Sequence, residues 1–265
     1  IDMAKTLEQT ARIALKDAGG IQGIPGYECY CTLEKTYKKM RLYAEAYPDL
    51  ATLEDIGDSW QKTQALQKGQ RNGGYDIFVL KITNKYSTGD KPKTLITSAL
   101  HPREYATAEL TIRFAEHLLE NYGKDPDITW LLDHQEVHLI IQANPDGRKA
   151  AEGGVLWRKN ANSSHCNGHS RFYGADLNRN FAFAWGEEGA GDKPCDETFR
   201  GSDAGSEPET KAIQDYLRRL FPDKRANDFS SPAPKNTSGV YIDIHSFGEL
   251  VLWPWGVSNN SAPNH

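Results

Sequence analysis

The hydrophobic positions of this chain alternate between helical spacing and strand-like runs. Apolar stripes with a period of about 3.6 residues, bounded by capping residues, predict helices at residues 3–17, 32–43, 104–121, 127–133 and 207–220. Alternating or continuous apolar runs between turn residues predict strands at residues 53–60, 75–82, 94–100, 137–141, 240–244 and 250–253. Because helices and strands interleave without an internal repeat or a linker, we expect one α/β domain.

Two stretches depart from this pattern. Residues 144–147, Asn-Pro-Asp-Gly, follow the strand at 137–141 almost directly and predict a turn. Residues 148–206 are rich in Gly, Asn, Ser and Asp and show no clear periodicity. Irregular segments of this length in a compact domain tend to carry function, so we expect functional residues there.

Composition narrows the class of protein. The chain has 265 residues, of which 38% are hydrophobic and 25% charged, and its mean hydropathy is -0.66. These values are typical of a globular protein and exclude a membrane span. Lysine and arginine total 31 against 36 acidic residues, a net charge of -5, which argues against a nucleic-acid or anionic-membrane partner.

Four cysteines are too few for a disulfide scaffold, and three pairings are possible. Cys166 and Cys195 lie 29 positions apart in the irregular segment. A bridge between them would stabilise the fold by about 3–4 kcal/mol through loop-closure entropy, and we favour this pair. Cys29 and Cys31 have no assigned role, and no cysteine spacing typical of structural zinc is present.

Two predicted strands deliver a histidine at their carboxyl ends. The strand at 94–100 is followed by His-Pro-Arg-Glu at residues 101–104, and a later strand is followed by His245. The carboxyl ends of strands in α/β sheets are where ligands bind. A lone His-x-x-Glu is more often an ordinary helix start, but two histidines and a carboxylate at one edge are the protein ligands of a catalytic zinc. We therefore predict a site for one Zn²⁺ formed by His101, Glu104 and His245.

The irregular segment also contains residues suited to anionic groups. Asn178 and Arg179 could hold a free carboxylate, because a planar guanidinium binds both oxygens while the amide donates another hydrogen bond. Arg158 is a candidate for stabilising an oxyanion. Asp176 is a candidate acceptor for the second ring nitrogen of a ligating histidine. Singly, such arginines are more often surface ion-pair partners and such an aspartate a turn residue, so these assignments depend on the zinc motif.

Taken in order, the motifs resemble the zinc carboxypeptidases of the carboxypeptidase A type, and most closely the bacterial carboxypeptidase T-like branch. The matching elements are residues 101–104, 144–147, 157–160, 176–180, 244–247 and 250–256. The resemblance implies a mixed, twisted β-sheet flanked by helices, in a catalytic domain at residues 27–265 after an N-terminal extension at 1–26. It also implies a disulfide between Cys166 and Cys195.

The resemblance implies an enzyme that hydrolyses the C-terminal peptide bond of peptides or proteins by a zinc-activated water. Zinc would be held by His101, Glu104 and His245, and Arg158 would stabilise the oxyanion. Asn178 and Arg179 would bind the terminal carboxylate of the substrate. Arg103 would assist the docking of the substrate before that step. The residues implied to bind substrate are Arg103, Asn178, Arg179, Phe247, Leu252 and Gly256.

One departure from the family concerns the general base. In the family this glutamate lies well downstream of the third zinc ligand, whereas this chain ends 20 positions after His245. We therefore expect a catalytic domain truncated at its C-terminal side, with weak or no activity alone. Two alternatives stay open: a related zinc amidohydrolase acting on N-acyl amino acids or peptidoglycan stems, and a non-catalytic module that binds zinc and carboxylates.

The expected setting follows from the same hypothesis. The chain opens at Ile1 without an initiator methionine, so a signal peptide or pro-segment could already have been removed. We expect a secreted or periplasmic monomer. Its substrates would be peptide or protein C-termini, with no nucleic-acid or membrane partner.

Overall fold

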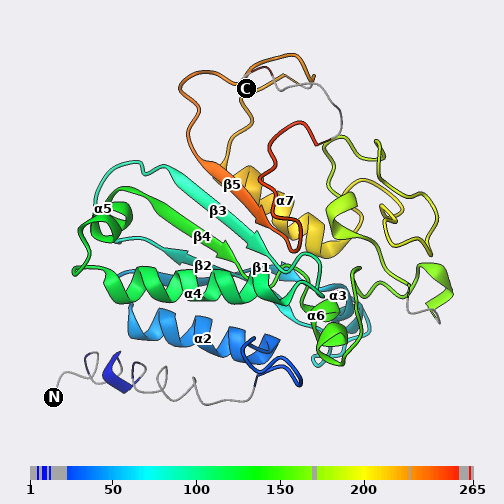
Figure 1. Cartoon of the computed structure of the whole chain (residues 1–265), viewed down its shortest axis with the longest axis horizontal. Helices are drawn as coiled ribbons and strands as arrows, with labels where there is room; N and C mark the ends of the chain where they lie inside the picture. The colour runs from blue at the N-terminus through cyan, green and yellow to red at the C-terminus, as the bar shows by residue number, and fades with distance from the viewer. Residues whose placement is uncertain are drawn as a thin grey trace.

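The computed structural model describes residues 5, 8–10, 12, 23–168, 172–226, 228–256 and 263. The helix predicted at residues 3–17 lies mostly outside these residues. Within them, one sheet carries helices on both faces (Figure 1). The expected mixed, twisted sheet flanked by helices is confirmed.

Among the described residues, the sheet has five strands in the order β1-β2-β4-β3-β5. The strands are β1 (Ala51–Asp58), β2 (Asp76–Ile82), β3 (Lys93–Ser98), β4 (Glu136–Ile140) and β5 (Val240–Ile244). β2 runs antiparallel to β1 and β4, whereas β3 runs parallel to β4 and β5. Most of β3 and β4 is buried, which explains why their sequences are continuous apolar runs.

The helices form a layer on each face of the sheet. They are α2 (Leu33–Ala46), α3 (Trp60–Gln67), α4 (Tyr105–Asn121), α5 (Pro126–His134), α6 (Pro145–Glu152) and α7 (Pro208–Leu220), with 3₁₀ helices η1 (Cys166–Gly168) and η2 (Leu177–Arg179). α2 and α4 lie on one side and α7 on the other (Figure 1). Met40 and Ile112 belong to one apolar core, and Ile213 of α7 belongs to a second. The alternation of side chains along the strands supplies both cores.

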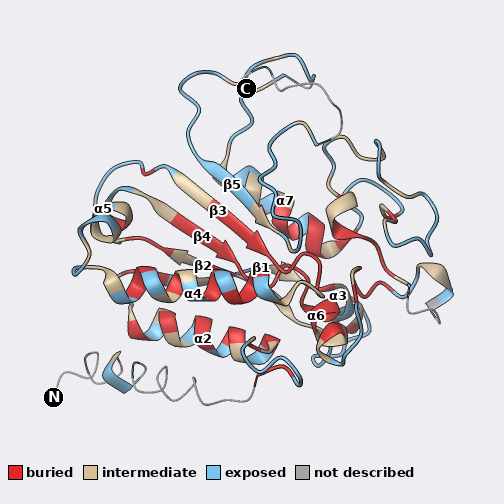
Figure 2. Cartoon of the chain, viewed as in Figure 1, coloured by how far each residue is buried: buried red, intermediate tan, exposed pale blue. Residues whose placement is uncertain are grey.

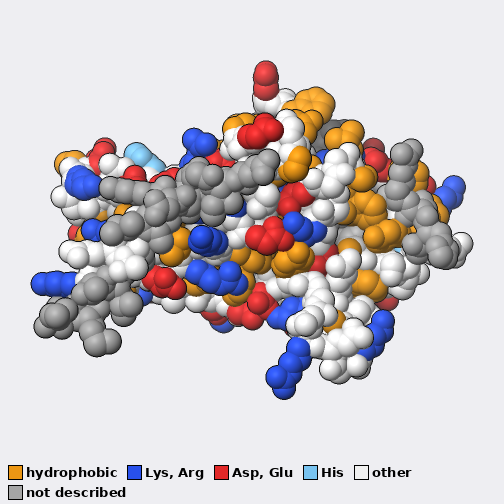
Figure 3. All heavy atoms as spheres, turned by 90° about the horizontal axis from the view of Figure 1, so that it is seen from below, with side chains coloured by type: hydrophobic (Ala, Val, Ile, Leu, Met, Phe, Trp, Pro, Cys, Tyr) orange, Lys and Arg blue, Asp and Glu red, His pale blue; other side chains and the backbone are white. Residues whose placement is uncertain are grey.

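Burial follows these layers. The helices α2 and α4 are buried where they face each other and the sheet, and exposed residues lie on their outward faces (Figure 2). On the side of α2, Lys and Arg side chains are interspersed with Asp and Glu rather than gathered into one basic field (Figure 3). Among the described residues, no helix has the length and apolar character needed to cross a membrane.

A short helix that the sequence pattern did not predict follows the first strand. β1 ends at Asp58, and Ser59 begins α3 by accepting a hydrogen bond from Lys62 N. The strand predicted to reach residue 60 was therefore too long. The helix escaped prediction because it has no apolar stripe, and Ala65 is its buried residue.

Residues 144–147 begin a helix, so the turn predicted there was wrong. The Asn144 side chain accepts a hydrogen bond from Gly147 N at 3.1 Å, and Pro145 occupies the first turn of α6. Asparagine followed by proline suits a helix N-terminus as well as a turn. The irregular segment accordingly starts at Gly153, after the end of α6.

A disulfide closes much of the irregular segment. Cys166 and Cys195 are bonded, so the favoured pairing is confirmed. Cys29 and Cys31 are free thiols, the first exposed and the second buried. Inside the segment, the buried ammonium group of Lys159 donates hydrogen bonds to backbone carbonyls on both sides of the bridge, which fixes the loop.

β5 forms one edge of the sheet, and the residues after it are exposed. Val240 and Ile242 are 52% and 43% exposed. The strand predicted at residues 250–253 was wrong, and these residues have no regular secondary structure. An apolar run becomes a strand only when a neighbour pairs with it, and none of the described residues does so here.

Candidate metal centre and active site

The sheet topology brings the two predicted histidines to one edge. His101 follows the carboxyl end of β3, and His245 directly follows the end of β5. In the parallel pairing of these strands, Ser98 lies opposite Ile244, so both chains leave the sheet side by side. Glu104 lies one turn after His101, at the N-cap of α4.

Three potential ligand atoms converge at this edge. His101 Nδ1 lies 2.9 Å from Glu104 Oε1, and His245 Nδ1 lies 3.1 Å from Glu104 Oε2. The two histidine Nδ1 atoms are 3.1 Å apart. A tetrahedral zinc with bonds of about 2.0–2.1 Å places its ligands about 3.3 Å from one another, so this donor set fits zinc. Among the described residues, His101, Glu104 and His245 form the one cluster of possible metal-ligating side chains that could hold a metal ion.

Each histidine has a carboxylate on its other ring nitrogen. His101 Nε2 lies 3.1 Å from Asp176 Oδ1, the contact predicted for Asp176. His245 Nε2 lies 2.8 Å from Asp243 Oδ2. Because each carboxylate contacts Nε2, the Nδ1 atom of each ring is left directed at the shared centre. Carboxylates orient metal-binding histidines in the same way in other proteins.

Asp243 was missed by the sequence reasoning. The signal was present, because Asp243 and His245 are two positions apart at the end of a strand and so share one side of it. Its other carboxylate oxygen accepts a hydrogen bond from Thr97 Oγ1 at 2.6 Å. Thr97 belongs to β3, so this contact joins the two strands that carry the ligands.

The charges in the site are arranged for a cation. Burial by itself would raise the pKa of Glu104, but hydrogen bonds with His101 and His245 outweigh it and hold the pKa at about 2. Burial opposes ionisation of Asp176 as well, yet hydrogen bonding to His101 and the charge of Arg158 keep its pKa below the usual range. Both carboxylates are therefore ionised at neutral pH.

Asp176 joins the metal site to the predicted oxyanion arginine. Its second oxygen, Oδ2, accepts hydrogen bonds from Arg158 Nε at 3.0 Å and Nη2 at 2.8 Å. Asp176 is fully buried, so this charge-assisted contact fixes the guanidinium plane. Nη1 of Arg158 takes no part in these two hydrogen bonds.

The predicted carboxylate-binding pair lies on η2, next to the same site. Asn178 Nδ2 is 3.4 Å from His245 Nε2. Arg179 donates from Nε to the carbonyl oxygen of Gly189 and from Nη1 to the carbonyl oxygen of Asn178, both at 3.0 Å. The side chain of Arg179 is thus held by backbone carbonyl oxygens of η2 and of the irregular segment.

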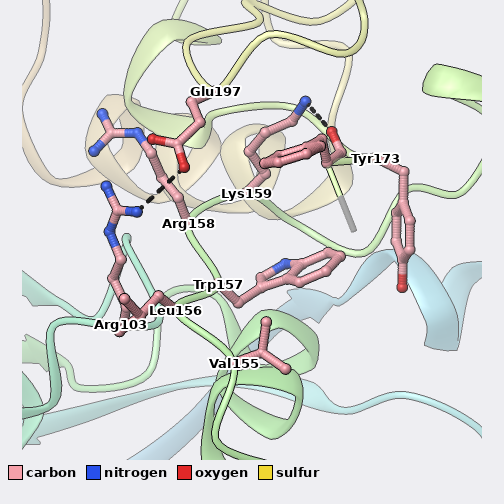
Figure 4. Close-up of a pocket in the computed structure, with 9 residues that line it drawn as sticks. Arg103, Val155, Leu156, Trp157, Arg158, Lys159, Tyr173 and Glu197 are labelled. Atoms are coloured by element: carbon pink, nitrogen blue, oxygen red, sulfur yellow. Dashed lines mark hydrogen bonds and ion pairs between the residues drawn. The ribbon is translucent and has the colours of Figure 1, made fainter. Parts of the chain in front are cut away.

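A cavity of about 270 Å³ opens beside Arg158 and Arg103. Figure 4 shows Arg103, Arg158 and Glu197 together on one side and Trp157 with Tyr173 on the other. Arg103 Nη1 donates to Glu197 Oε1 at 3.4 Å. The cavity therefore combines a charged end with an aromatic wall, as small-molecule and peptide pockets commonly do.

The structure does not bring all the predicted substrate-binding residues together. Phe247 and Leu252 are 102% and 82% exposed, and neither they nor Gly256 line this cavity. Ser246 does approach the metal site, where its backbone N–H donates to Glu104 Oε2 at 3.0 Å. A substrate-binding role for Phe247, Leu252 and Gly256 stays a prediction.

The fold and the site define an α/β protein with two histidines and a glutamate arranged to hold a metal ion at the carboxyl edge of its sheet. A model of the zinc carboxypeptidase family matches residues 36–265, and the chain belongs to this family. It is 33% identical to carboxypeptidase A1 of Bos taurus over 244 residues, which cover 90% of this chain and 49% of that protein. It is 31% identical to carboxypeptidase B2 of Rattus norvegicus, with 90% and 50% covered.

Solved structures agree with this assignment. The crystal structure of thrombin activatable fibrinolysis inhibitor superposes with a TM-score of 0.73 at 29% identity, covering 89% of this chain and 52% of that one. Carboxypeptidase A from Helicoverpa armigera gives a TM-score of 0.65 at 28% identity, with 83% and 46% covered. The chain thus spans about half the length of the relatives it matches.

Proposed function

We propose that this chain provides the zinc-binding part of a metallocarboxypeptidase that removes residues from the C-termini of peptides or proteins. The observation that carries the proposal is the convergence of His101 Nδ1, the Glu104 carboxylate and His245 Nδ1 within hydrogen-bond distance of one another. When bound there, zinc supplies Lewis-acid chemistry that activates water and polarises a carbonyl.

The residues around the ligands have separable roles in this proposal. Arg158, fixed by Asp176, stabilises the negative charge that develops on the carbonyl oxygen of the scissile bond. Asn178 and Arg179 bind the terminal carboxylate and so restrict cleavage to the last residue. Arg103 lines the adjoining cavity and guides the approach of the peptide.

Each described carboxylate that contacts the site histidines already has a role there. The carboxylates that contact the site histidines are Glu104, Asp176 and Asp243. The first is a ligand, and the others accept hydrogen bonds that orient the histidines. Because loss of a general base typically costs about 10²–10⁴-fold in rate, we expect these residues alone to bind zinc and hydrolyse peptides slowly or not at all.

The proposed compartment is extracellular or periplasmic. The disulfide between Cys166 and Cys195 supports this, since such bonds persist in oxidising compartments. The matched relatives named above are carboxypeptidases A and B of animals. Assignment to the bacterial carboxypeptidase T-like branch, and the monomeric state, stay predictions.

The test is zinc content after dialysis, measured by elemental mass spectrometry on the purified chain. We expect about one zinc per chain, lost in His245→Ala and retained in His117→Ala, which removes an exposed histidine of α4 outside the site. Retention of zinc by His245→Ala would contradict the proposed ligand set. Absence of zinc from the wild-type chain would contradict the proposal as a whole.

Substrate choice needs a second measurement. A panel of peptides that differ only in a free or amidated C-terminus tests the carboxylate grip, because an amide lacks the charge that Arg179 is proposed to bind. Release of the last residue from free but not amidated peptides supports a carboxypeptidase. Cleavage of N-acyl amino acids with no release from longer peptides would favour the amidohydrolase instead.

A further inference from the structure

A second cavity lies at the opposite end of the sheet from the zinc site. It has a volume of about 360 Å³, and its lining residues are Thr52, Lys81, Thr83, Asn84, Lys85, Ser87, Gly89, Lys91 and Glu136. The segment that carries most of them joins β2 to β3, beside α5 (Figure 1). β3 starts at this end with Lys93 and finishes at the zinc end with Ser98, so about 17 Å of strand separates the two sites.

The lining is strongly cationic. Three lysines, Lys81, Lys85 and Lys91, face one carboxylate, Glu136. Lys81 Nζ donates to Glu136 Oε1 at 2.8 Å, which compensates one of the three charges. The nearby Asp133 does not line the cavity, and its carboxylate accepts hydrogen bonds from Asn84 and Tyr122. The lining residues therefore carry a net charge of two positive.

The two remaining ammonium groups are held in place by neutral acceptors. The buried Lys91 donates to Thr83 Oγ1 at 2.9 Å, Asn84 O at 2.8 Å and Leu132 O at 3.1 Å. Lys85 donates to two carbonyl oxygens that flank the start of β1. Among the described residues, neither lysine forms an ion pair.

The pKa values of Lys85 and Lys91 are both lowered in this arrangement. Burial lowers the pKa of Lys85, the charge of Asp49 opposes that shift, and the charge of Lys81 adds to it. Burial likewise lowers the pKa of Lys91 against the opposing charges of Glu136 and Asp133, and Lys81 again adds to the lowering. Lys85 and Lys91 are thus each repelled by Lys81, and a bound anion would relieve that repulsion.

We propose that this cavity binds a phosphate or sulfate group. A tetrahedral dianion matches the net charge of the lining. Its oxygens can accept hydrogen bonds from Lys81, whose ammonium group donates to Glu136, and from Lys85, whose ammonium group donates to two carbonyl oxygens, since each has a further N–H to donate. The buried ammonium group of Lys91 adds fixed positive charge behind them. The lining hydroxyl groups of Thr52 and Ser87 suit the same oxygens.

Isothermal titration calorimetry with inorganic phosphate, at constant ionic strength set with chloride, tests the site. We expect saturable binding of phosphate, and at least about tenfold weaker binding by Lys85→Gln. Lys85 is exposed, so this variant keeps the fold, which its melting temperature checks. Glu136→Gln removes the one lining carboxylate and is expected to bind phosphate several-fold more tightly, an effect that a purely structural role does not produce.

The control is Lys211→Gln, which removes an exposed lysine of α7 and is expected to bind phosphate like the wild type, whereas Arg179→Gln reports phosphate bound at the proposed carboxylate site instead. Phenyl phosphate, titrated in parallel, shows whether the cavity takes the free ion alone or also a phosphorylated molecule, and saturable binding of either supports the site. Absence of saturable binding of either overturns the proposal. So does binding that is lost in Arg179→Gln but unchanged in Lys85→Gln.

Discussion

Two groups of acidic residues in this protein have opposite chemistry. In the proposed zinc site, Glu104 faces ring nitrogens, and its pKa is held at about 2. In a second group, the carboxyl cluster, defined as Asp146, Glu207 and Glu209, all three side chains are buried. Burial raises the pKa of Glu209 to about 8 and that of Asp146 to about 6. Residue type alone therefore does not identify a metal site.

The partner atoms explain the difference. Glu209 accepts hydrogen bonds from Trp60 N at 2.7 Å and Asn160 Nδ2 at 3.0 Å, and Asp146 accepts one from Gln61 N at 2.8 Å. These donors include the free backbone N–H groups at the start of α3. The carboxyl cluster thus satisfies donors and joins α3 to α6 and α7, whereas the zinc site gathers lone pairs that only a cation or a proton can satisfy.

The strongest test of this comparison exchanges one carboxylate for an amide in each group. Glu104→Gln removes a charged ligand, so we expect zinc content after dialysis to fall to background, a loss of affinity greater than about 100-fold. Glu209→Gln is the matched change in the carboxyl cluster and should keep full zinc content. Equal zinc content in both variants would show that the two groups do not differ as the geometry indicates.

The pH dependence of stability separates the groups in a second way. The native protein keeps a proton on Glu209 up to about pH 8, whereas an unfolded chain loses it near the ordinary value of 4.5. The free energy of unfolding should therefore fall as pH rises between these values. In Glu209→Gln the fall should be shallower, by up to about 1.4 kcal/mol per pH unit.

Glu207→Gln is the control for this titration. Burial opposes ionisation of Glu207, but hydrogen bonds from His165, Asn162 and Asn160 lower its pKa. Its contribution to stability is present above about pH 4.5 and is lost only in more acidic solution. Urea unfolding of the zinc-free proteins between pH 5 and pH 8 should then give Glu207→Gln the wild-type slope, and a wild-type slope in Glu209→Gln would refute the assignment of the raised pKa.

Local patterns were sufficient for most of the regular core, and they led to the three proposed metal ligands, which the structure brings together. The continuous apolar runs of β3 and β4 and the stripe of α4 report burial directly, and a histidine after each of two strands indicated the shared edge. The sequence also suggested that Asp176 accepts a hydrogen bond from a ligating histidine. Its simultaneous contact with His101 and Arg158 depends on tertiary structure and could not be predicted.

Elements stabilised by distant partners were not predictable in this way. α3 has no apolar stripe, and its N-terminus is stabilised by Asp146 and Glu209, which lie 85 and 149 positions away from their partners in the chain. The helix at 145–152 was mistaken for a turn because its first residues suit both. The apolar residues 250–253 were predicted as a strand, but pairing depends on a neighbour rather than on composition.

The smallest expected effect concerns the carboxylates behind the two histidines. Asp176→Asn keeps the size of the side chain but loses the charge that orients His101 and Arg158, so we expect zinc affinity to fall by about 10–100-fold. Asp243→Asn acts on His245 alone, and the Asp243 side chain is 19% exposed whereas that of Asp176 is fully buried. Its effect should lie near the lower end of that range, because water can partly replace the contact.

Competition with a chelator of known zinc affinity measures both changes, and Asp215→Asn, an exposed ion-paired aspartate on α7, is the control. The expected order of zinc affinity is control, then Asp243→Asn, then Asp176→Asn. Melting curves of the zinc-free proteins separate orientation from folding, because a positioning role lowers zinc affinity at unchanged melting temperature. If Asp243→Asn weakened zinc more than Asp176→Asn, the buried aspartate would not be the main positioning group, and the difference between the two histidines would have to come from their strands instead.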